Sequence, residues 1–320
     1  MINADKVLQW KNDIEASVDL YNDWFINFAP KAYRDMRIHT TEIVIDSLEK
    51  LHNLMDITPD KLFQNPEAIA ILRMCTIPPL ARDRLMGLGH LNKSFLSTIE
   101  ATGNYPPKMS KTAIYANLEA IADVFQKLID YDIFPWIRTD NEPTEKELFR
   151  ASSIVADRLC GAMANPIIRN AQEQRQLALI EDFLLKKGYT KTTERHTTIE
   201  TMKKGTFSFR LNVKANINGD NTSDTVNIPV DVVIKSKNLP QTSIPIFIEC
   251  KSAGDFTNTN KRRKEEAVKV AQLRNTFGKD CMLYLFLCGY FDSGYLGYEA
   301  AEGIDWIWEH RINDLEMLGI

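Results

Sequence analysis

A strict two-residue alternation of apolar and polar side chains in residues 207–217 is the feature that most constrains the fold. The segment reads FSFRLNVKANI, in which every odd position is apolar and every even position is polar. Because successive side chains of a strand point to opposite sides, this pattern predicts a β-strand with one buried face. Turn-forming residues at 219–221 and an alternating run at 225–235 follow, so the two runs are expected to form a β-hairpin. In the second run, the apolar residues at even positions from 226 to 234 are expected on one side.

The order of elements after this hairpin predicts a mixed sheet. Short runs rich in β-branched and aromatic residues lie at 244–251 and 281–291, and residues 261–277 between them have helical spacing. A strand, a helix and a strand in this order predict a crossover between parallel strands. A helix is expected before the sheet at 166–187, ended by Gly188, and another at the end of the chain, near 303–318.

The first half of the chain has a helical pattern instead. Up to about residue 160, apolar side chains recur at spacings of three, four and seven, and short segments rich in Pro, Gly or Asn separate the stripes. A chain of 320 residues can bury two cores. We therefore predict an α/β protein of the α+β type, with a helical domain at 1–160 and a second domain at 161–320 that holds a mixed central sheet flanked by helices.

Charge and cysteine usage narrow the class of protein. The five cysteines include no C-x-x-C pair, which argues against a disulfide framework and a structural zinc site. The first twenty residues lack the apolar core of a signal peptide, and no apolar run approaches the roughly 18 residues that a membrane span needs. We expect a cytoplasmic protein with no membrane partner. Its net charge of −4 leaves room for a local basic site that binds nucleic acid.

Three charged residues lie inside apolar stretches of the predicted strands. Asp231 is in the second run, and Glu249 and Lys251 are in the third, within IFIECK. Side-chain alternation places Glu249 and Lys251 on one face of their strand. An ionised group in such a place costs several kcal/mol unless it is paired or binds a metal. We therefore expect the three residues to lie together at the mouth of the sheet.

Two carboxylates on adjacent strands form a hard oxygen site suited to one or two Mg²⁺ ions. A divalent ion there would polarise a phosphodiester oxygen and lower the pKa of a bound water. Lys251 would lie beside that water and stabilise the attacking hydroxide or the extra negative charge on phosphorus. An isolated Glu-x-Lys is more often an ion pair at the rim of a sheet, and it is the order of the surrounding elements that favours catalysis.

These motifs resemble a known nuclease fold. Pro229-Val230-Asp231 and Glu249-x-Lys251 look like the PD-(D/E)XK motif of many type II restriction endonucleases, and the resemblance covers about residues 165–291. Val230 intervenes between the proline and the aspartate, which displaces the first motif by one residue but leaves the carboxylate in place. The layout of a helical half before a catalytic half is similar to that of the BsoBI/AvaI type. Segments at 78–85 and 165–173 resemble the XamI restriction endonuclease family.

The resemblance implies a type II restriction endonuclease that hydrolyses phosphodiester bonds of double-stranded DNA at a short sequence, with Mg²⁺ as its cofactor. A palindromic target implies a homodimer, and a cognate DNA methyltransferase is implied in the same host. The helical domain would serve as a DNA clasp or in dimerisation. Two alternatives remain open: a repair or recombination nuclease with the same fold, and a non-catalytic DNA-binding protein in which the carboxylates form structural ion pairs.

Glu173 is a further candidate for the catalytic site. It shares a helical stripe with Leu177, Ile180 and Leu184, so its side chain should point towards the sheet. In the fold that the chain resembles, a helix before the first strand sometimes contributes an extra acidic residue to the metal site. The alternative is a surface ion pair with Arg169, one turn earlier.

Contacts with DNA are expected from a polar segment that follows the third strand and from the polar face of the first. Amide and guanidinium groups can bind base edges bidentately, whereas lysines mainly hold phosphates. A solvated charged surface is the alternative. The candidates are Asn258, Thr259, Asn260, Lys261, Arg262, Arg263 and Lys264, with Arg210 and Lys214.

Overall fold

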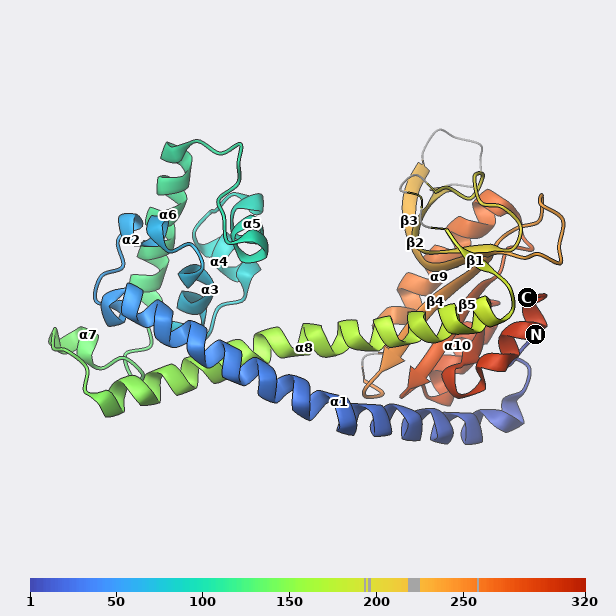
Figure 1. Cartoon of the computed structure of the whole chain (residues 1–320), viewed down its shortest axis with the longest axis horizontal. Coiled ribbons are helices and arrows are strands. Elements are labelled where there is room, and N and C mark those ends of the chain that lie inside the picture. Colours follow the sequence, from blue (N-terminus) through green and yellow to red (C-terminus); the bar gives the residue numbers. More distant parts are fainter. Residues whose placement is uncertain (193, 195–196, 218–224, 258) are drawn as a thin grey trace. The chain divides into compact units, whose positions relative to one another are not determined.

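The computed structural model describes residues 1–192, 194, 197–217, 225–257 and 259–320, with the backbone alone at 259–262 (Figure 1). The chain divides into two compact units, Ala29–Ile167 and a second that combines Met1–Phe28 with Ile168–Ile320. Two long helices, α1 (Val7–Lys50) and α8 (Glu145–Lys186), each continue from one unit into the other. The helices of the first half and the mixed sheet of the second confirm the predicted fold class.

The unit Ala29–Ile167 is helical, with a core of its own. Its longest internal helix, α6, begins after Ser110, whose hydroxyl accepts a hydrogen bond from the Ala113 amide at 3.2 Å. Leu118 of this helix and Phe95 are fully buried in that core. The other elements are η1 (His52–Leu54), α2 (Pro59–Gln64), α3 (Ala68–Leu72), η2 (Arg73–Cys75), α4 (Arg82–Leu88), α5 (Lys93–Thr102), α6 (Lys111–Leu128) and α7 (Trp136–Thr139).

The other unit is built on a six-stranded sheet in which spatial order follows chain order. The β2–β3 and β3–β4 pairs are antiparallel, whereas β1–β2, β4–β5 and β5–β6 are parallel. This topology confirms the predicted hairpin and the parallel crossover through α9 (Thr259–Phe277). The strands are β1 (Thr190–Lys191), β2 (Thr206–Asn216), β3 (Thr225–Lys235), β4 (Ile246–Ala253), β5 (Leu283–Gly289) and β6 (Asp305–Trp308).

Apolar clusters cover both faces of the sheet. One contains Val270 and Leu273 of α9, and the other contains Leu177 and Ile180 of α8. Strand β4 contributes alternately to the two, with Phe247 on the α9 side and its neighbours on the α8 side. The sheet is therefore buried on both faces at its centre, which explains the near-continuous apolar character of β4 and β5.

Strands β2 and β3 change the face that they bury, contrary to the prediction of one apolar side. Phe207 packs on the α8 side and Leu211 on the α9 side, and Arg210 between them has a φ of 50°. Across the ladder, Val230 lies on the α9 side and Val232 on the α8 side. The left-handed backbone at Arg210 rotates the rest of β2, and its partner strand follows.

The end of the chain also differs from the prediction. The expected α-helix at 303–318 is wrong, because strand β6 and a 3₁₀ helix (Glu309–Leu318) occupy this region, and the α-helix that precedes them, α10 (Ser293–Ala301), ends before it. All four residues of β6 are buried, so the strand shows no alternation of apolar and polar side chains. Helix α8 begins at Glu145, not at Pro166, and continues through that proline. Gly188 ends it with a φ of 79°, as predicted.

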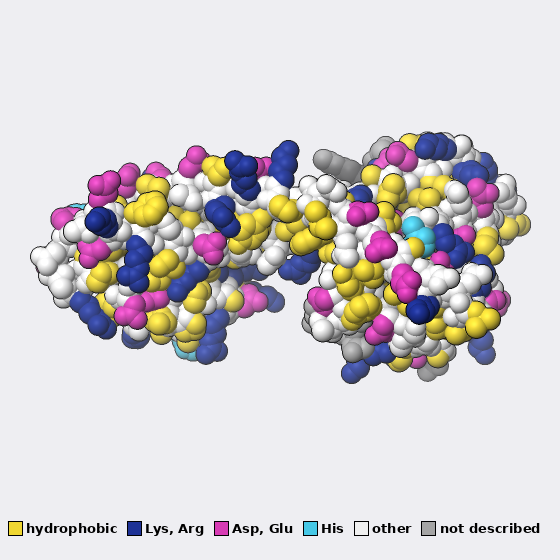
Figure 2. Space-filling view, turned by 90° about the horizontal axis from the view of Figure 1, so that it is seen from below, with side chains coloured by type: hydrophobic (Ala, Val, Ile, Leu, Met, Phe, Trp, Pro, Cys, Tyr) yellow, Lys and Arg dark blue, Asp and Glu magenta, His cyan; other side chains and the backbone are white. Residues whose placement is uncertain are grey.

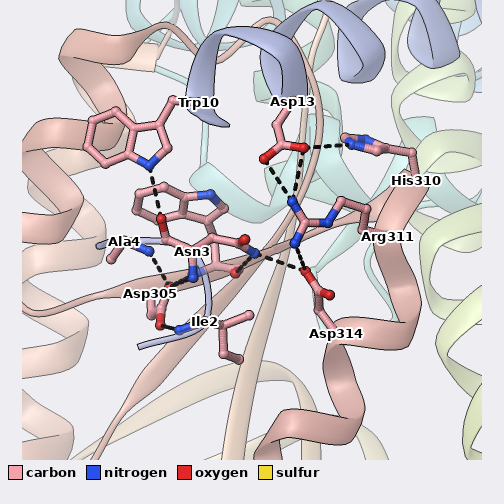
Figure 3. A network of polar contacts seen from close by, with 10 residues as sticks. Ile2, Asn3, Ala4, Trp10, Asp13, Asp305, His310, Arg311 and Asp314 are labelled. Carbon is pink, nitrogen blue, oxygen red and sulfur yellow. Dashed lines mark hydrogen bonds and ion pairs between the residues drawn. The ribbon is translucent and has the colours of Figure 1, made fainter. Parts of the chain in front are cut away.

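The first residues of the chain bind the buried carboxylate of Asp305 at the start of β6 (Figure 3). The backbone amides of Ile2, Asn3 and Ala4 donate hydrogen bonds to it, the last two at 3.0 and 2.9 Å. The Asn3 side chain donates to the carbonyl oxygen of Trp306 at 2.9 Å. The N-terminal segment thus satisfies a charge that would otherwise be buried alone.

Ion pairs extend this attachment along α1. Asp13 accepts from the Arg311 guanidinium at 2.9 Å, and Arg311 also pairs with Asp314 at 2.8 Å (Figure 3). Trp10 packs edge-on against Trp306 with the ring centroids 5.5 Å apart. The start of α1 therefore belongs structurally to the sheet. Among the described residues, no helix has both the length and the apolar character to cross a membrane.

Candidate active site

The site lies where β3 leaves β4. The ladder between these strands ends at the pair Val232 and Ile248. Asp231 is the residue directly before Val232 in the chain and lies just outside the ladder. At that point the Asp231 carboxylate replaces the backbone as the partner of β4, because its Oδ2 accepts a hydrogen bond from the Cys250 amide at 2.9 Å. This bond holds the carboxylate against the strand that carries Glu249 and Lys251.

Glu249 and Lys251 lie on the α9 face of β4, on the same side as Phe247. The Nζ atom of Lys251 is 3.4 Å from Oε2 of Glu249, and Glu249 is 3% exposed. The structure therefore brings together the three residues that were predicted to meet, at the point where the two central strands separate.

The electrostatics of the site reflect this crowding. Burial raises the pKa of Asp231 to about 6, and the charge of Glu249 adds to the rise, whereas the Cys250 amide opposes it. Burial alone would lower the pKa of Lys251, but Glu249, Glu266 and Asp231 outweigh it and raise that pKa. Lys251 is therefore a stable ammonium ion, whereas the ionised form of Asp231 is disfavoured.

Two residues of α9 that the sequence analysis did not single out complete the site. The Nζ atom of Lys269 is 2.8 Å from Oε1 of Glu249 and donates to the Pro229 carbonyl oxygen at 2.8 Å. The Oε1 atom of Glu266, which is 2% exposed, lies 3.7 Å from Nζ of Lys251. Glu266 lies four residues before the buried Val270, and Lys269 lies four residues before the buried Leu273, so charged side chains at helical spacing from apolar ones were the signal that could have revealed them.

Glu173 of α8 faces the sheet from the opposite layer. Its Oε1 accepts from Nη2 and Nε of Arg210 on β2, at 2.6 and 3.0 Å. The partner is thus Arg210, and not the Arg169 considered as its alternative. Burial is the main cause of the raised pKa of Asp231, and the charge of Glu173 makes a small contribution. Glu173 is close enough to act on the site electrostatically.

The residues expected to contact DNA have different surroundings. Arg210 and Lys214 are exposed on β2, and Lys264 is exposed on α9. The guanidinium of Arg263 lies over the Tyr298 ring, 4.9 Å from its centroid. On the face seen in Figure 2, the described basic and acidic side chains are mixed, so neither sign dominates it. Asn258 lies outside the described residues, as do the side chains of Thr259, Asn260, Lys261 and Arg262.

The donor set fits a hard divalent cation. Asp231 and Glu249 present carboxylate oxygens at adjacent positions, and the raised pKa of Asp231 shows that a nearby cation would be stabilised. No group of three or more His, Cys, Asp or Glu side chains suited to a metal occurs in the part of the chain that the structure describes. Two carboxylates suffice for an ion such as Mg²⁺, which keeps several waters in its shell.

A mixed sheet flanked by helices, with two carboxylates and a lysine where adjacent strands separate, defines the class of restriction-endonuclease-like proteins. A model of the XamI restriction endonuclease family matches residues 52–308. The chain is also 53% identical, over the full length of both proteins, to the type II restriction enzyme SalI of Streptomyces albus G. The chain belongs to the XamI restriction endonuclease family. No solved structure matches it.

This membership confirms the predicted family and the predicted enzyme class, a site-specific deoxyribonuclease. Enzymes of this class act on DNA and generally use a divalent metal ion.

Proposed function

We propose that Asp231, Glu249 and Lys251 are the catalytic centre of a type II restriction endonuclease that hydrolyses double-stranded DNA with Mg²⁺. The observation that carries this proposal is the position of the Asp231 carboxylate, which the Cys250 amide holds at 2.9 Å beside the strand of Glu249 and Lys251. The ionised form of a carboxylate that is buried at a break in a strand ladder is unfavourable by itself. Burial accordingly raises the pKa of Asp231 to about 6. Metal binding supplies a reason for this cost.

Asp231 and Glu249 would bind the metal ion through carboxylate oxygens. When bound, Mg²⁺ would polarise the scissile phosphate and lower the pKa of a coordinated water. Lys251 has a raised pKa and keeps its proton, so it acts as a fixed cation next to the attacking oxygen and the phosphate. Lys269 holds the second oxygen of Glu249 at 2.8 Å and fixes the orientation of that carboxylate.

Around this centre, Glu173 would be a further acid, held in place by Arg210 at 2.6 Å. The exposed Lys214 and Lys264 would bind phosphates, as would the basic start of α9. The helical unit Ala29–Ile167, which holds most of the domain predicted at 1–160, would clasp DNA or mediate dimerisation, and a homodimer would present two centres to a palindromic target. A methyltransferase in the same cytoplasm would protect the host DNA.

The test is digestion of unmethylated phage DNA by the purified protein, with and without Mg²⁺. We expect discrete fragments that require the metal, and no cleavage by Asp231→Ala or Lys251→Ala. Glu265→Gln is the matched control, because Glu265 is exposed on the same helix as Lys269. Fragments that persist in a folded Asp231→Ala variant would show that the site has been assigned wrongly.

Metal binding can be tested independently of cleavage. Titration calorimetry with Ca²⁺ should detect binding to the wild-type protein and a weaker affinity in Asp231→Asn and Glu249→Gln. Equal affinities in the three proteins would mean that these carboxylates form structural ion pairs, not a metal site.

A further inference from the structure

A buried pair of acids lies behind Lys251 and is not used by the chemistry proposed above. Glu266 of α9 is 2% exposed, and Glu299 of α10 is 0% exposed. The charge of Glu266 raises the pKa of Glu299, so the two carboxyl groups are close neighbours. Two ionised carboxylates would repel strongly in such a place, so the pair has to hold a proton.

The surroundings determine where that proton resides. Burial raises the pKa of Glu299 to about 9, and the charge of Glu266 adds to the rise. Glu266 has stabilising partners of its own: the Tyr295 hydroxyl donates to its Oε2 at 2.8 Å, and Lys251 lies 3.7 Å from its Oε1. At neutral pH Glu299 is therefore the protonated partner of the pair.

Glu266 faces Lys251, and Glu249, the other carboxylate near this lysine, has further partners of its own. The Oε1 atom of Glu249 is 2.8 Å from Lys269, and in the proposed function Glu249 also binds the metal. Glu249 therefore divides its charge between these partners and the Lys251 ammonium group, which lies 3.4 Å from its Oε2. Glu266 is the remaining carboxylate that the structure places within 4 Å of that nitrogen.

We propose that Glu266 is the positioning residue of Lys251, kept singly charged by a protonated Glu299 and by the Tyr295 hydroxyl. The inference rests on the proposed function, because it assigns Glu266 a role in orienting the catalytic lysine. Glu266 acts through Lys251, whose Nζ lies 3.7 Å from its Oε1. Carboxylates of this kind, behind a functional group, typically change activity by about 10- to 100-fold when they are altered.

The experiment compares Glu266→Gln with Glu265→Gln, which removes an exposed charge from the adjacent position of α9. We expect Glu266→Gln to slow single-turnover cleavage by about 10- to 100-fold while the dissociation constant for DNA stays within about twofold. Glu265→Gln should cleave at the wild-type rate. Wild-type cleavage by Glu266→Gln, or equal losses in both variants, would overturn the proposal.

Tyr295→Phe provides a second, milder test should Glu266→Gln fail to fold. It removes one hydrogen bond to Glu266 and keeps the ring that packs against Phe291. We expect cleavage to slow by about 3- to 10-fold, again without a change in DNA affinity. An unchanged cleavage rate would contradict the proposal.

The proton on Glu299 can be tested without any activity measurement. Among the described residues, the charged and titratable groups that face the pair include Lys251 from β4, Arg263 from α9, Tyr295 from α10 and Glu302 directly after it. Because the pKa of Glu299 is raised from 4.5 to about 9, the folded state loses stability as pH rises between these values. Glu299→Gln should therefore raise the Tm more at pH 8 than at pH 5. A Tm difference independent of pH would show that Glu299 is ionised.

Failure of this inference can be told apart from failure of the proposed function. If Lys251→Ala still cleaved DNA, the proposed function would be wrong, whatever the result for Glu266→Gln. Lys251→Ala that is inactive, together with a fully active Glu266→Gln, would overturn the positioning role alone.

Discussion

At Asp231, the proposed catalytic role and the stability of the protein make opposite demands on one side chain. The Cys250 amide fixes its carboxylate next to Glu249, and burial raises its pKa from 3.8 to about 6. In the metal-free protein this carboxyl costs stability, and the cost grows from pH 3.8 to 6 and is constant above. The rise in pKa corresponds to at most about 3 kcal/mol.

Asp231→Asn should therefore stabilise the metal-free protein while it abolishes cleavage. The amide oxygen of Asn can still accept from the Cys250 amide, so only the charge is lost. We expect a higher free energy of unfolding than wild type in EDTA at pH 8, by at most about 3 kcal/mol, and no difference near pH 4. Urea denaturation measures both. A variant that is less stable at pH 8 would contradict the assignment of unfavourable charge to this site.

Arg210 shows a second cost at a single residue. Its φ of 50° lies in the left-handed region, where a residue with a Cβ costs about 1–2 kcal/mol. Its guanidinium pairs with Glu173, and the register places Arg210 across from Asp231, between the pairs Phe209–Val232 and Leu211–Val230. The strained residue therefore lies beside the site, where such strain often accompanies function.

The strain can be measured by comparing Arg210→Gly with Arg210→Ala. Both variants lose the ion pair with Glu173, but only glycine adopts a positive φ without penalty. We expect Arg210→Gly to be more stable than Arg210→Ala by about 1 kcal/mol in urea denaturation. Equal stabilities, or a more stable alanine variant, would mean that the backbone at this position is not strained.

At the scale of elements, the sequence predicted those strands whose pattern of side chains is typical of a strand and not of a helix. The alternation of β2 and β3 and the charges inside β3 and β4 revealed the hairpin together with Asp231, Glu249 and Lys251. Strand β6 was missed, because it is buried on both faces and has no period. Glu266 and Lys269 were missed for a different reason: charges on a helix are usually solvated, and only the packing of α9 against the sheet buries these two.

Helix α8 contains a destabilising proline, Pro166, which was predicted to lie at the start of a helix. Pro166 lies inside the helix, where it lacks the amide that would bond to the preceding turn. Because its side chain is exposed, alanine can replace it without loss of packing. Pro166→Ala should raise the free energy of unfolding by about 2 kcal/mol, after allowance for the gain in unfolded-state entropy.

Pro59→Ala is the matched control for Pro166→Ala. Pro59 is the first residue of α2, directly after the N-cap Thr58, and a proline at this position costs no hydrogen bond. We expect no stabilisation from this change in the same denaturation series. If both substitutions stabilised equally, the gain could not be ascribed to the interior of α8.

At the scale of the whole molecule, the sheet depends on a segment that is distant in sequence. Met1–Phe28 belongs to the unit of the sheet, and the chain enters and leaves the helical unit through α1 and α8. The carboxylate of Asp305 is 1% exposed and receives the amides of the first residues. Trp10, at 7% exposure, packs on Trp306 in the core of the same unit.

A fragment of residues 161–320, cut at the boundary predicted from the sequence, should therefore fail to fold alone. It would leave Asp305 buried without its partners, at about 3–5 kcal/mol, and lose the burial of Trp10, at about 2 kcal/mol, against a total stability of about 5–15 kcal/mol. Addition of a peptide of residues 1–28 should restore cooperative thermal unfolding, and the peptide with Asn3→Ala should do so less well, since it lacks the bond to Trp306. Calorimetry of the three samples measures this. A cooperative transition in the fragment alone would mean that the N-terminal segment covers an already stable unit.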